Sequence, residues 1–320
     1  MNRRNFLTLT ACAPAMAALQ SMSRAEDELP PVIDTHIHLF DTERAGGVPW
    51  PAKNDDILYK PALPDRYRKI AVPPGIVGAI VVEASPWPED NQWVLDIAEK
   101  DSIIVGTIGN LEPGKPDFRP QLERFRRNPL FRGIRYGNLW GRDLAGRLTD
   151  PGFISDLQFL AEAGLVLDTA NPNPALLSAI VRVTDQVPTL RVVIDHLPQM
   201  AVPEDPATRS RYEADLQELS GRDQVYVKLS AVLRRVDGNI PTDLSFYRER
   251  LDILFETFGQ DRLLYGSDWP NSDKWQPFNV GLGLVSQYFR EKGREAAEKY
   301  FWKNSVKAYQ WRKRHPSQPG

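Results

Sequence analysis

The sequence predicts a (β/α)8 barrel, and three observations support this fold class. Eight short runs rich in Val, Ile and Leu recur along residues 30–315. Amphipathic, helix-like segments lie between these runs. The alternation extends over roughly the 250 residues that are typical of a TIM-type barrel. A doubly wound open sheet is the alternative, but no G-x-G-x-x-G motif follows the first run, which argues against a dinucleotide-binding version.

Each apolar run is a predicted strand, because aliphatic and β-branched residues are enriched in buried strands. The predicted strands are Val32–Leu39, Val77–Glu83, Ile103–Gly109, Phe131–Tyr136, Leu165–Thr169, Arg191–His196, Val225–Ser230 and Leu263–Asp268. The predicted helices are Asn91–Lys100, Gln121–Asn128, Phe153–Ala163, Pro174–Gln186, Ala207–Ser220, Leu244–Phe258 and Glu291–Trp311. The stretch Asp41–Pro74 is rich in Pro and Gly. We expect it to be a long loop above the C-terminal ends of the strands, where barrel active sites form.

The first 25 residues differ in composition from the rest, and we interpret them as an export signal. They hold three arginines and no acidic residue, followed by a weakly apolar run and small residues at its end. This order is typical of a cleaved secretory signal, and the pair Arg3-Arg4 resembles a twin-arginine signal. We therefore expect residues 26–320 to form the barrel in the periplasm or outside the cell. A lipobox-like segment leaves lipidation at Cys12 as an alternative.

Composition excludes several classes of protein. Hydrophobic residues make up 42% of the chain and charged residues 26%, which suits a folded core and argues against a disordered chain. The formal net charge is -2, so no basic excess points to nucleic acid. The N-terminal apolar run is too short and too rich in Ala and Thr for a good membrane span. We expect a small-molecule substrate as the partner, while assembly into a homo-oligomer stays open.

The residues that carry chemistry lie at predicted strand ends. His36 and His38 end the first strand, His196 ends the sixth and Asp268 ends the eighth. Side chains alternate along a strand, so Asp34, His36 and His38 are expected to share one face. A barrel closes its eighth strand beside its first, which places Asp268 next to the histidine pair.

Three imidazoles and one carboxylate match a mononuclear zinc-type site. We therefore expect His36, His38, His196 and Asp268 to hold one divalent metal ion, with zinc as the expected ion. The same groups also act without a metal, because imidazoles polarise a carbonyl and a carboxylate accepts a proton from water. Both versions stay open. The fourth histidine, His315, lies in a basic C-terminal tail that we expect to be mobile.

Four charged residues are predicted to support the site. Arg135 on the fourth strand is expected to bind a substrate carboxylate or hydroxyl groups, with a salt bridge at the barrel rim as the alternative. Lys228 on the seventh strand is expected to bind an anionic substrate or to form an ion pair with Asp168 or Asp268. Asp168, at the end of the fifth strand, is expected to bind substrate hydroxyls or to support a histidine. Glu83, at the end of the second strand, is expected to act in the same way.

Aromatic residues also follow predicted strands. Trp87, Trp140 and Trp269 follow the second, fourth and eighth strands and are expected to line the mouth of the barrel, with core or lid packing as the alternative. Other catalytic motifs are missing from the sequence. It contains no G-x-S-x-G nucleophile elbow, no H-E-x-x-H motif and no P-loop.

Several motifs resemble the amidohydrolase superfamily. They are Val-Ile-Asp-Thr-His36-Ile-His38, Val-Ile-Asp-His196 and Leu-Tyr-Gly-Ser-Asp268-Trp-Pro. Within the superfamily the chain is similar to the amidohydrolase-2 branch, and Gly133-Ile-Arg135 and Val225–Ser230 resemble its sugar-lactone and pyrone-dicarboxylate lactonases. The resemblance implies a TIM-barrel hydrolase that opens a lactone or a similar carboxylic ester. The fifth strand has no histidine, and the fourth has no obvious bridging residue, so a binuclear metal site is not expected.

We therefore predict an exported hydrolase in which Asp268 is the general base. In this prediction His36, His38 and His196 bind a metal or polarise the substrate carbonyl. Two alternatives remain: a non-oxidative decarboxylase of the same superfamily, and an exported binding protein that has lost its catalytic activity.

Overall fold

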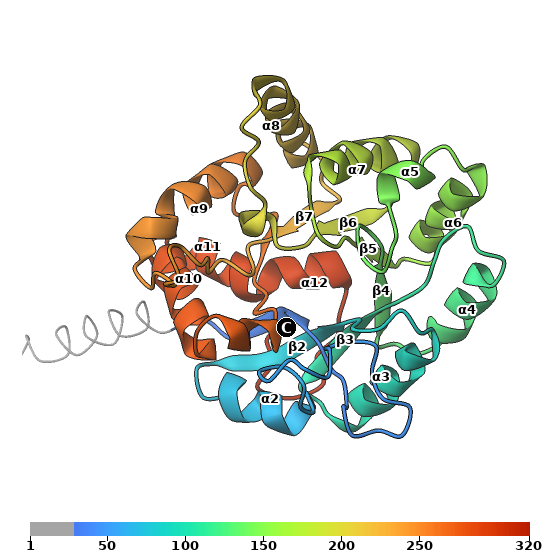
Figure 1. Cartoon of the computed structure of the whole chain (residues 1–320), viewed down its shortest axis with the longest axis horizontal. Helices are drawn as coiled ribbons and strands as arrows, with labels where there is room; N and C mark the ends of the chain where they lie inside the picture. The colour runs from blue at the N-terminus through green and yellow to red at the C-terminus, as the bar shows by residue number, and fades with distance from the viewer. Residues whose placement is uncertain (1–28) are drawn as a thin grey trace, which may run out of the picture.

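The computed structural model describes residues 29–320. The predicted export signal, Cys12 and the predicted cleavage site lie outside these residues. Eight parallel strands pair in chain order within one sheet (Figure 1). A bridge between Ile37 and Trp269 joins the first strand to the segment after the eighth, so the sheet curls into a barrel. The predicted (β/α)8 barrel is confirmed.

The strands are β1 Val32–Ile37, β2 Ile76–Val82, β3 Ile104–Gly109, β4 Phe131–Arg135, β5 Val166–Asp168, β6 Arg191–Ile194, β7 Val225–Lys228 and β8 Leu263–Leu264. The α-helices are α2 Pro64–Ala71, α3 Glu89–Lys100, α4 Phe118–Phe125, α5 Leu144–Arg147, α6 Pro151–Glu162, α7 Pro174–Gln186, α8 Pro206–Ser220, α9 Leu244–Phe258, α10 Phe278–Lys292, α11 Arg294–Glu298 and α12 Asn304–Tyr309. Short helical turns are η1 Leu197–Gln199, η2 Asn271–Lys274 and the π-turn η3 Lys299–Lys303. Within residues 29–320, no helix combines the length and apolar character needed to cross a membrane.

The first strand contains a β-bulge between Asp34 and Ile37. Asp34 lies opposite Ala79 and Ile37 lies opposite Val81, so β1 advances three residues where β2 advances two. The extra residue reverses the alternation of side chains beyond it. Asp34 therefore points away from the site and accepts a hydrogen bond from Tyr67 Oη of α2 at 2.7 Å. The prediction that Asp34 shares a face with His36 and His38 is wrong, because simple alternation assumes an unbroken strand.

Two helix predictions also need correction. Helix α2 lies inside the stretch that was expected to be a loop, where Pro64 at its first position suits a helix start. The long helix predicted for Glu291–Trp311 is interrupted. Gly293 adopts a φ of 97° between α10 and α11, a conformation that favours glycine and ends α10.

The C-terminal segment closes the end of the barrel at which the strands begin. Figure 1 shows α12 crossing the middle of the ring of strands. Its Tyr309 packs among inward-facing strand residues and donates a hydrogen bond to Asp168 Oδ2 at 3.0 Å. Beyond it, Arg314 donates to backbone carbonyls of α3 and β3, and Gln318 is only 1% exposed. The tail that carries His315 is thus packed against the barrel, contrary to the expectation of a mobile segment.

We expect Tyr309→Phe to lower the free energy of unfolding by about 1–3 kcal/mol, because a buried carboxylate oxygen loses a hydrogen-bond donor. Denaturant titration followed by circular dichroism measures the change. Tyr212→Phe is a matched control, since the Tyr212 hydroxyl is buried without a partner among the described residues. Equal effects of the two substitutions would contradict the assigned role of the Tyr309 hydroxyl.

Candidate active site

Four side chains converge at the C-terminal ends of the strands. Asp268 Oδ1 lies 3.8 Å from Nε2 of His36, 3.4 Å from Nε2 of His38 and 3.7 Å from Nε2 of His196. The two Nε2 atoms of His36 and His38 lie 3.3 Å apart. All four residues are buried, with exposed fractions of 9% or less. Closure of the barrel thus brings together the four residues that the sequence singled out.

The backbone at this site is unusual for non-glycine residues. His196 and Asp268 follow their strands with φ values of 51° and 58°. Such left-handed conformations are uncommon and tend to occur at functional sites. The Asp268 amide donates to the His36 carbonyl at 2.9 Å, which ties the loop after β8 to β1. Only glycine fits at position 266, because a Cβ there would lie 2.8 Å from His36 Cβ.

Hydrogen bonds behind the imidazoles orient them. His196 Nδ1 lies 2.8 Å from Ser230 Oγ, and His38 Nδ1 lies 3.0 Å from the Val82 carbonyl oxygen. A carbonyl only accepts hydrogen bonds, so His38 Nδ1 donates to it. In neutral His38 the lone pair is therefore on Nε2, the atom that faces Asp268. Contacts of this kind set the orientation of histidines in catalytic and metal sites.

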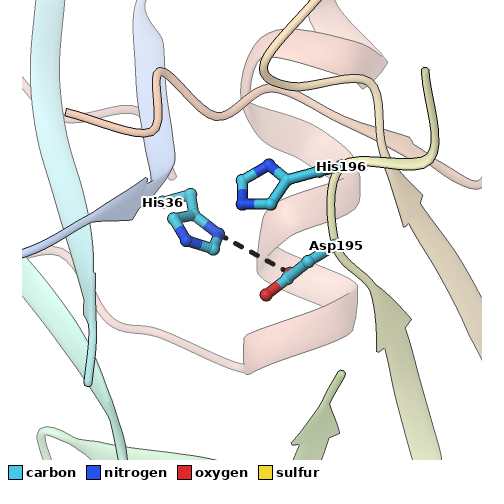
Figure 2. Close-up of side chains that lie close together, drawn as sticks. All are labelled: His36, Asp195 and His196. Carbon is cyan, nitrogen blue, oxygen red and sulfur yellow. Dashed lines mark ion pairs between the residues drawn. The ribbon is translucent and has the colours of Figure 1, made fainter. Parts of the chain in front are cut away.

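A buried charge cluster of Lys228, Asp168, Asp195 and His36 lies beneath the imidazoles. Lys228 Nζ lies 2.7 Å from Asp168 Oδ2, 2.9 Å from Asp195 Oδ1 and 3.2 Å from His36 Nδ1. All four side chains are fully buried. Figure 2 shows His36 facing Asp195 and His196, with the ion pair between His36 Nδ1 and Asp195 Oδ1 at 3.6 Å marked by a dashed line.

Asp195 was not among the predicted site residues. A signal for it was present in the sequence, since it immediately precedes His196 at the end of an apolar run. The sequence pattern predicts a role only for the histidine of this pair.

Burial and neighbouring charges set the protonation of these groups. Burial alone would raise the pKa of Asp268, but the three imidazoles hold it below its usual range, so the carboxylate is ionised. Burial, and then the charge of Lys228, lower the pKa of His36 well below the ordinary value. Burial also lowers the pKa of His196. Burial would lower the pKa of Lys228 as well, yet Asp168 and Asp195 raise it, so Lys228 is charged.

A cavity of about 350 Å³ opens above Asp268. This volume lies within the range of roughly 300–1,000 Å³ that is usual for small-molecule sites. The cavity is lined by His38, Trp50, Ala84, Arg135, Leu139, Trp140, Asn171, His196, Gln199, Asp268, Asn271, Lys274 and Trp275. Aromatic rings and side-chain amides therefore surround the ionised carboxylate.

Arg135 and Trp140 line this cavity, as the sequence predicted. Arg135 Nε donates to Glu83 Oε1 at 2.7 Å, and Trp140 Nε1 donates to Glu83 Oε2 at 3.0 Å. Arg135 therefore lines the cavity and also forms the salt bridge that was weighed as its alternative role. Glu83 holds both side chains in place from the end of β2.

The structure does not bring four other predicted residues to the cavity. Lys228 and Asp168 are fully buried in the charge cluster, so the prediction that they bind substrate does not fit their position. Trp87 is 42% exposed outside the cavity, where the Arg44 guanidinium lies 5.7 Å from its ring. Trp269 is fully buried and packs against Tyr67.

The predicted long loop contributes a cavity residue that was not singled out, Trp50. Its ring centroid lies 5.7 Å from that of His38. Before α2, the loop is held by two ion pairs: Arg44 with Asp90 of α3 at 2.8 Å, and Asp55 with Lys274 of η2 at 2.6 Å. Pro and Gly content predicted a functional loop here, but sequence alone gave no signal for these long-range contacts.

The residues present fit one metal ion. A tetrahedral ion with bonds of roughly 2.0–2.1 Å holds its ligand atoms about 3.3 Å apart. The 3.3 Å between Nε2 of His36 and Nε2 of His38, and the 3.4–3.8 Å from Asp268 Oδ1 to the three Nε2 atoms, are close to this value. His36, His38 and Asp268 form one group able to hold an ion, and His36, Asp195 and His196 form another. The Nε2 lone pair of neutral His38 faces a carboxylate oxygen, an arrangement that is repulsive unless a positive charge lies between the two atoms.

Known proteins share both the sequence pattern and the fold. An L-fucono-1,5-lactonase from Burkholderia ambifaria is 29% identical over 246 residues, covering 75% of this chain and 80% of that protein. An amidohydrolase from Burkholderia multivorans, crystallised with bound zinc, superposes with a TM-score of 0.77 at 22% identity, covering 88% of this chain and all of that one. A putative 2-pyrone-4,6-dicarboxylic acid hydrolase from Pseudomonas putida has a TM-score of 0.69 at 20% identity, covering 88% and 97% of the two chains.

At these identities the two structural matches support the fold alone. The amidohydrolase family model decides the family, because it matches residues 33–311, which include every strand of the barrel and all four converging residues. The chain belongs to the amidohydrolase-2 family of hydrolases.

Proposed function

We propose that the protein opens the ring of a lactone by attack of an activated water molecule. The observation that carries this proposal is the ionised Asp268 carboxylate at the base of a cavity of about 350 Å³, within 3.8 Å of three imidazoles. A carboxylate beside electrophilic groups in a substrate-sized cavity is the arrangement that hydrolysis by water requires. The similarity to an L-fucono-1,5-lactonase supports a lactone as the substrate.

In the proposed mechanism Asp268 is the general base. It accepts a proton from water as the water oxygen attacks the lactone carbonyl carbon. The ring C–O bond then breaks, and protonated Asp268 returns the proton to the leaving alkoxide. The product is a hydroxy acid, and Asp268 regains its charge. An imidazole that carries its proton on the nitrogen facing the cavity stabilises negative charge on the carbonyl oxygen during this sequence.

His36 separates the metal-dependent and metal-free versions of this mechanism. Its Nδ1 lies near both Asp195 Oδ1, at 3.6 Å, and Lys228 Nζ, at 3.2 Å. With the proton on Nδ1 and directed to Asp195, the Nε2 lone pair is free to bind a metal. With Lys228 donating to Nδ1, the proton is on Nε2, which lies 3.8 Å from Asp268 Oδ1 and does not itself line the cavity. Both versions stay open.

In the metal-dependent version, His36, His38, His196 and Asp268 hold one divalent ion, for which zinc is our expectation. When bound, the ion would supply Lewis-acid polarisation of the carbonyl.

The cavity lining favours a neutral, hydroxylated ring over a dicarboxylate. Two cationic side chains line the cavity, and both already have carboxylate partners. Arg135 pairs with Glu83 at 2.7 Å, and Lys274 pairs with Asp55 at 2.6 Å. The side-chain amides of Asn171, Gln199 and Asn271 also line it, and amides both donate to and accept from hydroxyl groups. A sugar lactone therefore fits the lining better than an anionic pyrone.

We expect Asp268→Asn to lower kcat by about 10²–10⁴-fold, because an amide does not accept the proton from water. The assay is a panel of sugar lactones and aryl lactones, scored for acid release with a pH indicator. Asp273→Asn is the matched control, since Asp273 pairs with Arg66 nearby and does not line the cavity. We expect the control to keep near-native kcat.

Near-native activity of the Asp268→Asn variant would remove Asp268 from its assigned role. The same assays test the alternatives. Carbon dioxide release without acid formation from a lactone would indicate a decarboxylase. Substrate binding without turnover of any panel member would support a binding protein.

We expect metal analysis of untagged protein to find at most one divalent ion per chain, because the two groups of possible ligands among the described residues share His36. In the metal-dependent version, chelation abolishes activity and zinc restores it, while His38→Asn lowers the bound metal. Full activity in a metal-free preparation would contradict a catalytic metal. Two ions per chain would contradict a mononuclear site.

Export through the twin-arginine route to the periplasm is part of the proposal, supported by Arg3-Arg4 and the apolar run after it. We expect replacement of both arginines by lysine to reduce the periplasmic fraction of the protein by at least about tenfold, because the signal is read as an arginine pair. Immunoblots of cell fractions measure the periplasmic share of the protein.

Arg24→Lys, outside the arginine pair, is the control for this export experiment. Export unchanged by the double substitution would contradict this route, and membrane retention that Cys12→Ala abolishes would indicate the lipoprotein alternative.

A further inference from the structure

A second cavity, of about 270 Å³, lies between α9, η1 and the loop after β7. Its lining includes three apolar side chains that are unusually exposed for their type: Val202 at 39%, Phe246 at 48% and Ile253 at 43%. None of its lining residues lines the cavity above Asp268. The proposed function does not use this cavity.

Two guanidinium groups line the same cavity, and neither has a carboxylate partner among residues 29–320. Arg234 donates to the Pro198 carbonyl, and Arg250 donates to the carbonyls of Leu197 and Met200 at 3.1 and 3.4 Å. All of these acceptors are neutral. Arg250 Nε is buried and has no hydrogen-bond partner among the described residues. Glu249 also lines the cavity, but it forms no ion pair with either guanidinium in residues 29–320.

This lack of a carboxylate partner contrasts with the neighbouring Arg248. On the same helix, Arg248 forms two hydrogen bonds with Glu291, at 2.6 and 3.0 Å. The two guanidinium groups donate to the carbonyls of consecutive residues of η1, Leu197 and Pro198, so they lie close together. Burial, and then the charge of Arg250, lower the pKa of Arg234. Two adjacent positive charges held only by neutral carbonyls favour an anion between them, since hydrogen bonds from a cation to an anion are the stronger kind.

We propose that this cavity binds a small organic carboxylate with an apolar body. The carboxylate contacts Arg234 and Arg250, and the apolar body packs against Phe246, Ile253 and Val202. Charge alone would suit any anion, but the exposed apolar wall selects a ligand with aliphatic or aromatic carbon attached. The combination of a paired cationic end and an apolar wall is the pattern by which proteins bind such amphipathic anions.

Hexanoate is the probe, and hexanamide is its neutral counterpart. Isothermal titration is expected to show one hexanoate per chain, with hexanamide binding at least about tenfold more weakly because it lacks the charge. Arg234→Gln and Arg250→Gln are each expected to weaken hexanoate binding by about tenfold or more. Arg248→Gln, the matched control on α9, is expected to bind hexanoate like the parent protein. Asp268→Asn is expected to do the same, because it lies in the other cavity.

One further variant protects the test against loss of folding, since both arginines also hold the carbonyls of η1. Ile253→Glu places a carboxylate at the exposed edge of the cavity without removing a contact to η1. It is expected to abolish hexanoate binding while the melting temperature stays near that of the parent protein.

Three results would overturn the proposal. One is the absence of saturable hexanoate binding, which would limit the arginines to holding η1. Another is binding that Asp268→Asn abolishes and the arginine variants leave unchanged, which would place the ligand in the cavity above Asp268. The third is a change in oligomeric state in the arginine variants with no hexanoate binding, which would assign this face to contact between copies of the chain.

Discussion

The site depends on the pairing of one buried ammonium with two buried carboxylates. Lys228 lies fully buried between Asp168 and Asp195, and all three are out of contact with water. A charge in such a place is strongly destabilising without its partners, so each member requires the others. The cluster contacts His36 Nδ1 and thereby determines whether the opposite nitrogen carries a proton or a lone pair towards Asp268. Lys228, which does not line the cavity, thus controls the protonation of His36.

The chain also accepts unfavourable backbone geometry to place its reacting groups. Asp268 and His196 occupy left-handed conformations directly after strands, and Gly266 allows the loop after β8 to approach β1. Non-glycine residues in this region typically cost about 1–3 kcal/mol each. The packed barrel below compensates for this strain, since its strands bury two continuous apolar layers. The stability of the packed barrel therefore allows the strained backbone at the strand ends.

Much of the fold and the centre of the site followed from sequence because both depend on local patterns. Apolar runs mark strands, and barrel closure then places Asp268 beside His36 without further information. The features that escaped prediction depend on contacts between distant segments. Asp34 was misplaced because a bulge reverses the alternation, and Trp50 reaches the cavity only because ion pairs hold its loop. Lys228 was recognised as unusual, but its depth in the barrel depends on which charges surround it.

The C-terminal tail has a practical consequence for how the protein is handled. It covers the end of the barrel where the strands start, while substrate enters at the opposite end. A fusion partner or an immobilisation handle attached after Gly320 would therefore point away from the entrance and leave it accessible. Trimming the last residues is a different matter, because loss of Arg314 and Gln318 would uncover backbone carbonyls of β2 and β3 and remove support from α12. At this end of the barrel, adding a partner to the tail is therefore better tolerated than shortening the tail.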